Sequence, residues 1–158
     1  MPSENPQYSK NEVSGEFDRA ASYYADERGQ SPWFQAQMRI ALEMLDAAQG
    51  QERLLDIGCA AGAEIPPLLA RGFQIVGIDY SPEILRLAEQ RLGALHGVRL
   101  CRGDAEALPF PDASFDRVVC LGVFEYLATY DRCLEEIRRV LRCAREAWRL
   151  SPCRRGSA

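Results

Sequence analysis

Along most of the chain, short runs of apolar residues alternate with longer segments in which apolar residues recur every three or four positions. A short apolar run between turn signals predicts a buried strand, and the longer spacing predicts an amphipathic helix. Helices are expected over residues 17–28, 32–50, 63–72, 81–97 and 131–148, and strands over 53–58, 73–79, 98–104 and within 115–127.

Local signals support these assignments. Ser81 is a suitable N-cap, and Pro82 occupies the first helical position, where a missing N–H is tolerated. Pro66 and Pro67 require that their helix begins near them or is kinked. Strands that alternate with helices predict an α/β fold in which right-handed crossovers wind both faces of a parallel sheet.

Composition narrows the function classes. The chain has 158 residues, enough for one domain, and a net charge of −4, which argues against binding nucleic acid through phosphate neutralisation. No apolar run approaches the roughly 20 residues that span a bilayer, and the N-terminus lacks a signal pattern, so a cytoplasmic protein without a membrane partner is expected. Six cysteines without C-x-x-C spacing and a single histidine predict no metal site.

Three segments are expected along the chain. Residues 1–14 are polar and predicted to be flexible, residues 15–142 form the α/β core, and residues 143–158 form an atypical basic tail.

Polar residues gather at the predicted strand ends, where open parallel sheets bind ligands. The stretch LLDIGCAAG holds Asp56 just before Gly58 and Gly62, whose backbones can turn tightly and approach a ligand. Asp79 ends the next strand and is suited to accept two hydrogen bonds from a ribose diol. Asp104 follows the third strand and could accept a hydrogen bond from an adenine amino group.

Asp56 distinguishes between nucleotide types. A dinucleotide places its pyrophosphate at this turn, and a carboxylate there would repel it. A sulfonium and an ammonium would instead be attracted. The residues therefore favour S-adenosylmethionine over NAD, and the missing third glycine of G-x-G-x-x-G points the same way.

Four stretches, LLDIGCAAG, GIDYSPEILRLAEQRL, GDAEALPFPDASFDRVVC and CLEEIRRVLR, resemble in order the motifs of the class I S-adenosylmethionine-dependent methyltransferases that act on small molecules. The resemblance runs from about Phe17 to Leu141. It implies a Rossmann-like three-layer αβα fold, S-adenosylmethionine as cofactor, S-adenosylhomocysteine as product, and a small molecule whose O, N or C atom accepts the methyl group.

The resemblance also implies roles for single positions. Asp56, Gly58 and Gly62 would belong to the methionine-side loop, and Tyr23 or Tyr24 would close over the cofactor. The cofactor-binding residues expected in this way are Tyr24, Asp56, Gly58, Ala60, Gly62, Asp79, Tyr80 beside the adenine, Asp104 and Ala105 at the adenine edge, and Leu121 beside the methionine. Glu125 and Tyr126 are equally well explained as catalytic residues or as the start of a helix, so no general base is assigned.

The chain departs from the family pattern in two places. Ala60 replaces the middle glycine of the loop, which is tolerated if its φ is negative. After VLR the family continues with Pro-Gly-Gly and further strands, whereas this chain reads CAREAWRLSPCRRGSA. Codons for residues 144–148 can encode Pro-Gly-Gly-Leu in a shifted frame, so a frameshifted or truncated sheet is expected, lacking the C-terminal strands of the usual seven. Its fourth strand would form an open edge that favours self-association.

Two other functions compete with a methyltransferase. A truncated remnant would bind the cofactor without transferring a methyl group, or would bind nothing. An NAD-dependent oxidoreductase would bind NAD, against which Asp56 argues.

Overall fold

The computed structural model describes residues 10–127 and 129–142. Its elements in chain order are α1 (Lys10–Arg19), α2 (Ala21–Asp26), the 3-10 turn η1 (Arg28–Gln30), α3 (Pro32–Met44), β1 (Arg53–Ile57), α4 (Ile65–Leu69), β2 (Gln74–Asp79), α5 (Pro82–Leu92), β3 (Val98–Arg102), β4 (Arg117–Cys120), the 3-10 turn η2 (Phe124–Tyr126) and α6 (Asp131–Val140).

The four strands form one parallel sheet in the order β3-β2-β1-β4. Ile57 of β1 aligns with Ile78 of β2 on one side and with Cys120 of β4 on the other. The chain adds β2 and β3 on one side of β1 and then returns to place β4 on the opposite side. The order of the strands therefore reverses beside β1, and ligands bind at such a switch point in open α/β sheets.

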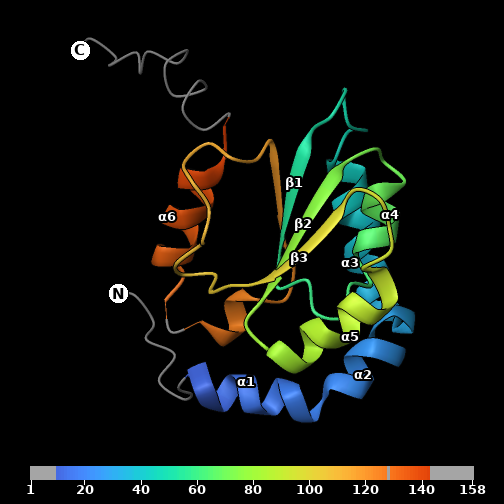
Figure 1. Ribbon diagram of the computed structural model, residues 1–158, viewed down its shortest axis with the longest axis vertical. Coiled ribbons are helices and arrows are strands. Elements are labelled where there is room, and N and C mark those ends of the chain that lie inside the picture. The colour runs from blue at the N-terminus through green and yellow to red at the C-terminus, as the bar shows by residue number, and fades with distance from the viewer. Residues whose placement is uncertain (1–9, 128, 143–158) are drawn as a thin grey trace, which may run out of the picture.

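Apolar side chains on both faces of the sheet are buried by helices. Leu54, Ile75 and Val119 face the side on which α3, α4 and α5 pack, and Leu55 and Ile78 face the side on which α6 packs. Figure 1 shows the sheet between α6 on one side and α3 and α4 on the other. The predicted doubly wound, three-layer α/β fold is thus confirmed.

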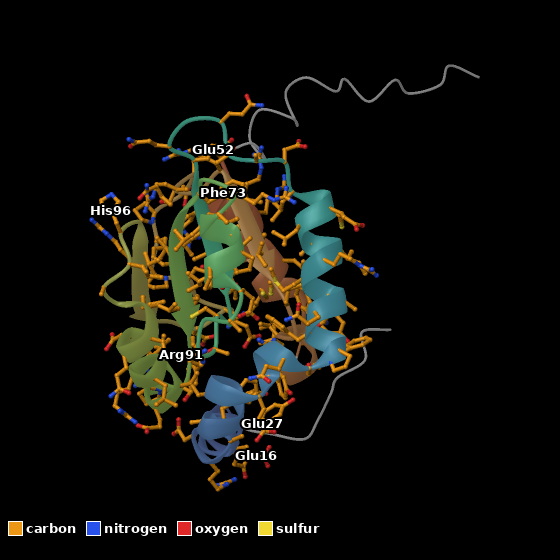
Figure 2. All side chains as sticks on the ribbon, turned by 90° about the vertical axis from the view of Figure 1, so that its right-hand side faces the viewer. Glu16, Glu27, Glu52, Phe73, Arg91 and His96 are labelled. Atoms are coloured by element: carbon orange, nitrogen blue, oxygen red, sulfur yellow. The ribbon has the colours of Figure 1, made fainter. Side chains whose placement is uncertain are left out.

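The N-terminal helices cover one end of the sheet. Figure 2 shows Glu52, Phe73 and His96, each of which precedes a strand, at the end opposite to Glu16 and Glu27 of the N-terminal segment. The helices α1 and α2 therefore lie at the carboxyl ends of the parallel strands, as Figure 1 also shows. The first segment of the chain closes the end at which a ligand is expected.

The capping signals act as predicted. The Ser81 hydroxyl accepts a hydrogen bond from the Ile84 N–H at 3.1 Å, with Pro82 in the first turn of α5. Pro66 and Pro67 lie in the first turn of α4, so this helix begins at them. Among the described residues, no helix has the length and apolarity needed to cross a membrane.

Several element boundaries differ from the prediction. The helix expected over 32–50 ends at Met44, because Leu45 is extended and its carbonyl accepts a hydrogen bond from the Arg71 guanidinium at 2.6 Å. The helix expected over 17–28 is interrupted at Ala20, and α1 begins at Lys10, inside the segment predicted to be flexible.

The last helix also ends earlier than predicted. Leu141 turns to an extended conformation and forms a parallel bridge with Phe115, beside the start of β4. The predicted continuation over 143–148 and the basic tail lie outside the described residues. The expected self-association through the β4 edge stays a prediction.

Gly62 allows α5 to pack directly against the turn that follows β1. Its φ is +78°, and a Cβ at this position would lie 2.0 Å from Leu92 Cδ1 of α5. Only glycine combines this backbone conformation with this close approach.

Replacing Gly62 with Ala should lower the free energy of unfolding by about 2–4 kcal/mol, because backbone strain and the collision with Leu92 add. Gly50→Ala is the matched control, since Gly50 has a φ of +79° and no atom within 4 Å of an added Cβ. Gly50→Ala should lower the free energy of unfolding by the backbone strain alone, about 1–2 kcal/mol. Urea unfolding measures both, and equal losses would show that α5 does not constrain this turn.

Candidate functional site

A cavity of about 330 Å³ lies at the carboxyl ends of the strands, under the N-terminal helices. It is lined by Phe17, Tyr23, Tyr24, Arg28, Ser31, Trp33, Phe34, Gln37, Ile57, Gly58, Ala60, Ile78, Asp79, Tyr80, Gly103, Asp104, Ala105, Leu121, Gly122, Val123, Glu125, Tyr126 and Leu127. Its size is that of a small-molecule or cofactor site, and it occupies the switch point beside β1.

The Asp79 carboxylate organises the floor of this cavity. One oxygen accepts a hydrogen bond from the Ala60 N–H at 3.0 Å, and the other accepts one from the Ser81 N–H at 2.9 Å. Burial raises the pKa of Asp79, and these backbone donors oppose the shift because they stabilise the charged form. The carboxylate has further lone pairs with which to accept hydroxyl hydrogen bonds.

The turn after β1 approaches the loop after β4 closely. Gly58 has a φ of +72°, and a Cβ there would lie 2.3 Å from Val123 Cγ2. Ala60 has a φ of +44°, so the condition under which alanine would replace glycine without strain is not met. A left-handed alanine costs roughly 1–2 kcal/mol, and the hydrogen bond from its N–H to Asp79 helps to hold it.

A second group of residues forms the wall beyond β2 and β3. The Tyr80 ring lies in the cavity wall with the Arg102 guanidinium over it, 5.3 Å from the ring centroid. Asp104 accepts a hydrogen bond from the Glu106 N–H at 2.9 Å and so forms a turn after β3. Gly103 and Ala105 flank it in the wall. This turn fixes the position of Asp104, so the residue can stabilise the loop and line the cavity at the same time.

Aromatic rings cover the cavity. Phe17 packs edge-on against Tyr126 with 4.8 Å between centroids, and its ring centroid lies 5.3 Å from that of Tyr24. Burial raises the pKa of the Tyr24 and Tyr126 hydroxyls. Both hydroxyls therefore stay protonated at neutral pH and can donate hydrogen bonds.

A buried ion pair that sequence reasoning missed lies beside the cavity, between η1 and the residue before α4. The Arg28 guanidinium donates a hydrogen bond to Glu64, whose side chain is only 1% exposed. The same guanidinium lies 4.8 Å from the centroid of the Phe34 ring and 5.7 Å from that of Tyr24. Arg28 lines the cavity, so a single cation faces both the interior carboxylate and the ligand space.

Asp56 lies behind this ion pair. It is 1% exposed, and its Oδ2 has no hydrogen-bond partner, as is also true of Glu64 Oε2. Burial raises the pKa of Asp56 well above its usual range, the Glu64 charge adds to the shift, and Arg28 opposes it. The one guanidinium near these two buried carboxyl groups hydrogen-bonds to Glu64 and acts on Asp56 through its charge.

Most predicted site residues meet at the cavity. Asp56 and Gly62 do not line it; Asp56 is buried in β1, and Gly62 packs against Leu92 of α5. The residues present in the wall are Tyr24, Gly58, Ala60, Asp79, Tyr80, Asp104, Ala105, Leu121, Glu125 and Tyr126. Arg28 carried no sequence signal, because its partner Glu64 stands 36 positions away.

Comparison with known proteins identifies the family to which the chain belongs. A family model described as "Methyltransferase domain" matches residues 55–144, which hold β2, β3, β4 and all of β1 except its first two residues. The chain belongs to the class I S-adenosylmethionine-dependent methyltransferases.

Individual relatives agree with this assignment. The chain is 42% identical over 97 residues to a demethylmenaquinone methyltransferase of Deinococcus radiodurans, a match that covers 60% of the chain and 40% of that protein. It is 34% identical over 136 residues to the enzyme of the same name from Thermus thermophilus, covering 82% of the chain and 58% of that protein. The chain thus spans about half the length of these two relatives.

A solved structure shares the fold of this methyltransferase chain. The cyclase SpnF superimposes with a TM-score of 0.68 at 27% identity, over 86% of the chain and 57% of SpnF. Its name is that of a cyclase, so a likeness to this structure supports the fold rather than one reaction.

Replacing Asp56 with Asn should stabilise the protein, by about 1–3 kcal/mol at pH 8 and less at pH 5. An acid whose pKa is higher in the folded state binds more protons there, so its contribution to the free energy of unfolding falls as pH rises. Asn at position 56 does not ionise, so the difference in free energy of unfolding between the variant and the wild type should grow with pH.

Urea unfolding at pH 5, 6.5 and 8 measures this advantage. Asp46→Asn, on an exposed carboxylate of the segment before β1, should show no such trend. A variant less stable than the wild type at pH 8 would mean that attraction to Arg28 outweighs the burial of the charge.

Proposed function

We propose that the chain binds S-adenosylmethionine in the cavity and transfers its methyl group to a small molecule, leaving S-adenosylhomocysteine. The observation that carries this proposal is the Asp79 carboxylate, which closes the glycine turn and lies in the cavity wall at the end of β2. A carboxylate at this position suits the two hydroxyls of a ribose.

The residues that line the cavity suit the ribose, the adenine and the methionine part of such a cofactor. Asp79 would accept the ribose hydroxyls, and Tyr80, Asp104 and Ala105 would border the adenine. The turn at Gly58 and Ala60, with Leu121 opposite, would border the methionine part. The cavity is large enough to hold a ligand of this class.

Charge favours this cofactor over a dinucleotide. Asp56 and Glu64 are buried behind the turn, and the Arg28 guanidinium is paired with Glu64, an arrangement that disfavours a pyrophosphate beside them. The sulfonium and ammonium groups of the cofactor would be attracted by the same carboxylates. Arg28, in the cavity wall, is the cation available for the cofactor's carboxylate.

The chain would contribute mainly proximity and orientation. The bound cofactor supplies an activated methyl group, so little further activation is required. Tyr24 and Tyr126, both protonated at neutral pH, would exclude water and donate hydrogen bonds at the acceptor side. Glu125 lies beside Tyr126 in the wall, and we propose that both position the acceptor rather than remove its proton.

The acceptor we propose is a small, apolar, planar molecule such as a reduced quinone. Phe17, Tyr23, Trp33 and Phe34 line the cavity, and Trp33 is 72% exposed, so that its ring is available to a ligand. Two relatives are named as methyltransferases of demethylmenaquinone, which supports this class of acceptor.

Calorimetric titration with S-adenosylhomocysteine, with NADH as control, tests the cofactor. We expect micromolar binding of the former alone. Asp79→Asn should weaken it about 30–100-fold, because the substitution removes the negative charge and replaces one accepting oxygen with an NH2 group that cannot accept a hydrogen bond. Glu89→Gln, an exposed change on α5, should leave affinity unaltered.

Three other outcomes would contradict parts of the proposal. Binding of NADH alone would identify an oxidoreductase. Cofactor binding without transfer of labelled methyl to any reduced quinone in a panel would identify a non-catalytic remnant or a different acceptor class. A folded protein that binds neither ligand would exclude both cofactors.

Arg28→Lys tests recognition of the cofactor's carboxylate. Lysine keeps the charge but loses the guanidinium fork, so S-adenosylhomocysteine should bind about tenfold more weakly. Methylthioadenosine lacks the amino-acid part and should bind the wild type and the variant equally. An equal loss for both ligands in the titration would show instead that Arg28 acts by shaping the cavity with Tyr24 and Phe34.

A further inference from the structure

Glu64 is a buried acid to which the proposed methyl transfer gives no direct contact. It stands immediately before α4, its side chain is 1% exposed, and it does not line the cavity. Its Oε1 accepts a hydrogen bond from Arg28 Nη1, and its Oε2 has no partner among the described residues. The Arg28 side chain is 14% exposed and lines the cavity. Glu64 can therefore act on a bound ligand by direct contacts only through Arg28.

The Arg28 guanidinium lies between two elements that meet at the cavity. Nη1 donates to Glu64 before α4, whereas Nη2 lies beside the loop after β4, where a Cβ built on Gly122 would be 3.7 Å away. Arg28 Cζ lies 5.7 Å from the centroid of the Tyr24 ring and 4.8 Å from that of Phe34, so two rings restrict the space around it. One end of the guanidinium is thus bound by an interior acid, and the other lies at the cavity wall.

The backbone brings Arg28 to this place without fixing its side chain. A Cβ at Gly29 would lie 3.3 Å from Ala63 Cβ, so η1 packs closely on the turn that leads to Glu64. An arginine side chain retains many rotamers on a fixed backbone, and ordering such a side chain when a ligand binds lowers the affinity. The hydrogen bond to Glu64 orders Arg28 before a ligand binds and removes part of that loss.

We propose that Glu64 is a positioning residue for the cofactor, because it orients the Arg28 guanidinium so that its other N–H groups meet the carboxylate of the methionine part. This role rests on the proposed function, in which Arg28 recognises that carboxylate. A guanidinium carries more N–H donors than one carboxylate engages, so it can bind Glu64 on one side and a ligand on the other. Glu64 thereby helps to select ligands that carry an amino-acid carboxylate.

Two substitutions of similar length isolate the hydrogen-bond acceptor at position 64. Glu64→Gln and Glu64→Met both remove the charge, but only the first keeps an oxygen that can accept from Arg28. We expect S-adenosylhomocysteine to bind Glu64→Gln within about twofold of the wild type and Glu64→Met about three- to tenfold more weakly in calorimetric titration.

Methylthioadenosine, which lacks the amino-acid part, is the control ligand. It should bind the wild type and both variants equally, which also shows that each variant is folded at the cavity. In an Arg28→Met background, Glu64→Gln and Glu64→Met should bind S-adenosylhomocysteine equally, because the residue through which position 64 acts is gone. A merely structural role of Glu64 would instead lower the affinity for both ligands.

Equal binding of S-adenosylhomocysteine by Glu64→Met and Glu64→Gln would overturn the positioning role, whether both match the wild type or both lose the same affinity. In the first case the acceptor has no effect, and in the second the charge rather than the orientation is responsible. Loss of methylthioadenosine by either variant would also overturn it. These results leave the cofactor in place if the wild type binds S-adenosylhomocysteine, whereas a wild type that binds neither ligand contradicts the proposed function and the role of Glu64 together.

Discussion

The Asp79 carboxylate accepts backbone hydrogen bonds from Ala60 and Ser81, and it thereby joins the turn after β1 to the beginning of α5. The Gly58 and Cys59 N–H groups, which both donate to the Ile78 carbonyl, hold the same turn to the end of β2. The bond to Ala60 also holds a residue in a left-handed conformation that its side chain disfavours. Because the same carboxylate lies in the cavity wall, the geometry of the proposed ribose site and the geometry of the turn depend on one group.

A cluster of buried charged residues lies next to this turn. Asp56 and Glu64 lie behind it with one guanidinium, so the interior holds more acid groups than cations in this cluster. Such an excess of buried acid groups lowers the free energy of unfolding when no further cation is bound. A cationic ligand offsets that cost, so the unfavourable burial and the proposed preference for a sulfonium have the same electrostatic origin. Functional sites commonly concentrate such locally unfavourable features.

The cavity is assembled from parts that are distant in the chain. The sheet supplies its floor, the loop after β4 one wall, and the N-terminal helices its cover (Figure 1). The cover consists largely of aromatic rings, whereas the floor carries the Asp79 carboxylate beside Ile57 and Ile78. This division matches a ligand that is polar at its nucleoside end and a partner molecule that is apolar.

The sequence by itself determined the strands, the parallel α/β class and most of the cavity floor. Those features depend on local signals: apolar runs, a capping serine before Pro82, and acids such as Asp79 at strand ends. Only the tertiary structure decided the sign of φ at Ala60, the burial of Asp56 and the pairing of Arg28 with Glu64. It also ended the helix after Met44, where Arg71 bonds the Leu45 carbonyl. Each of these depends on contacts between residues far apart in the chain, which a local pattern does not encode.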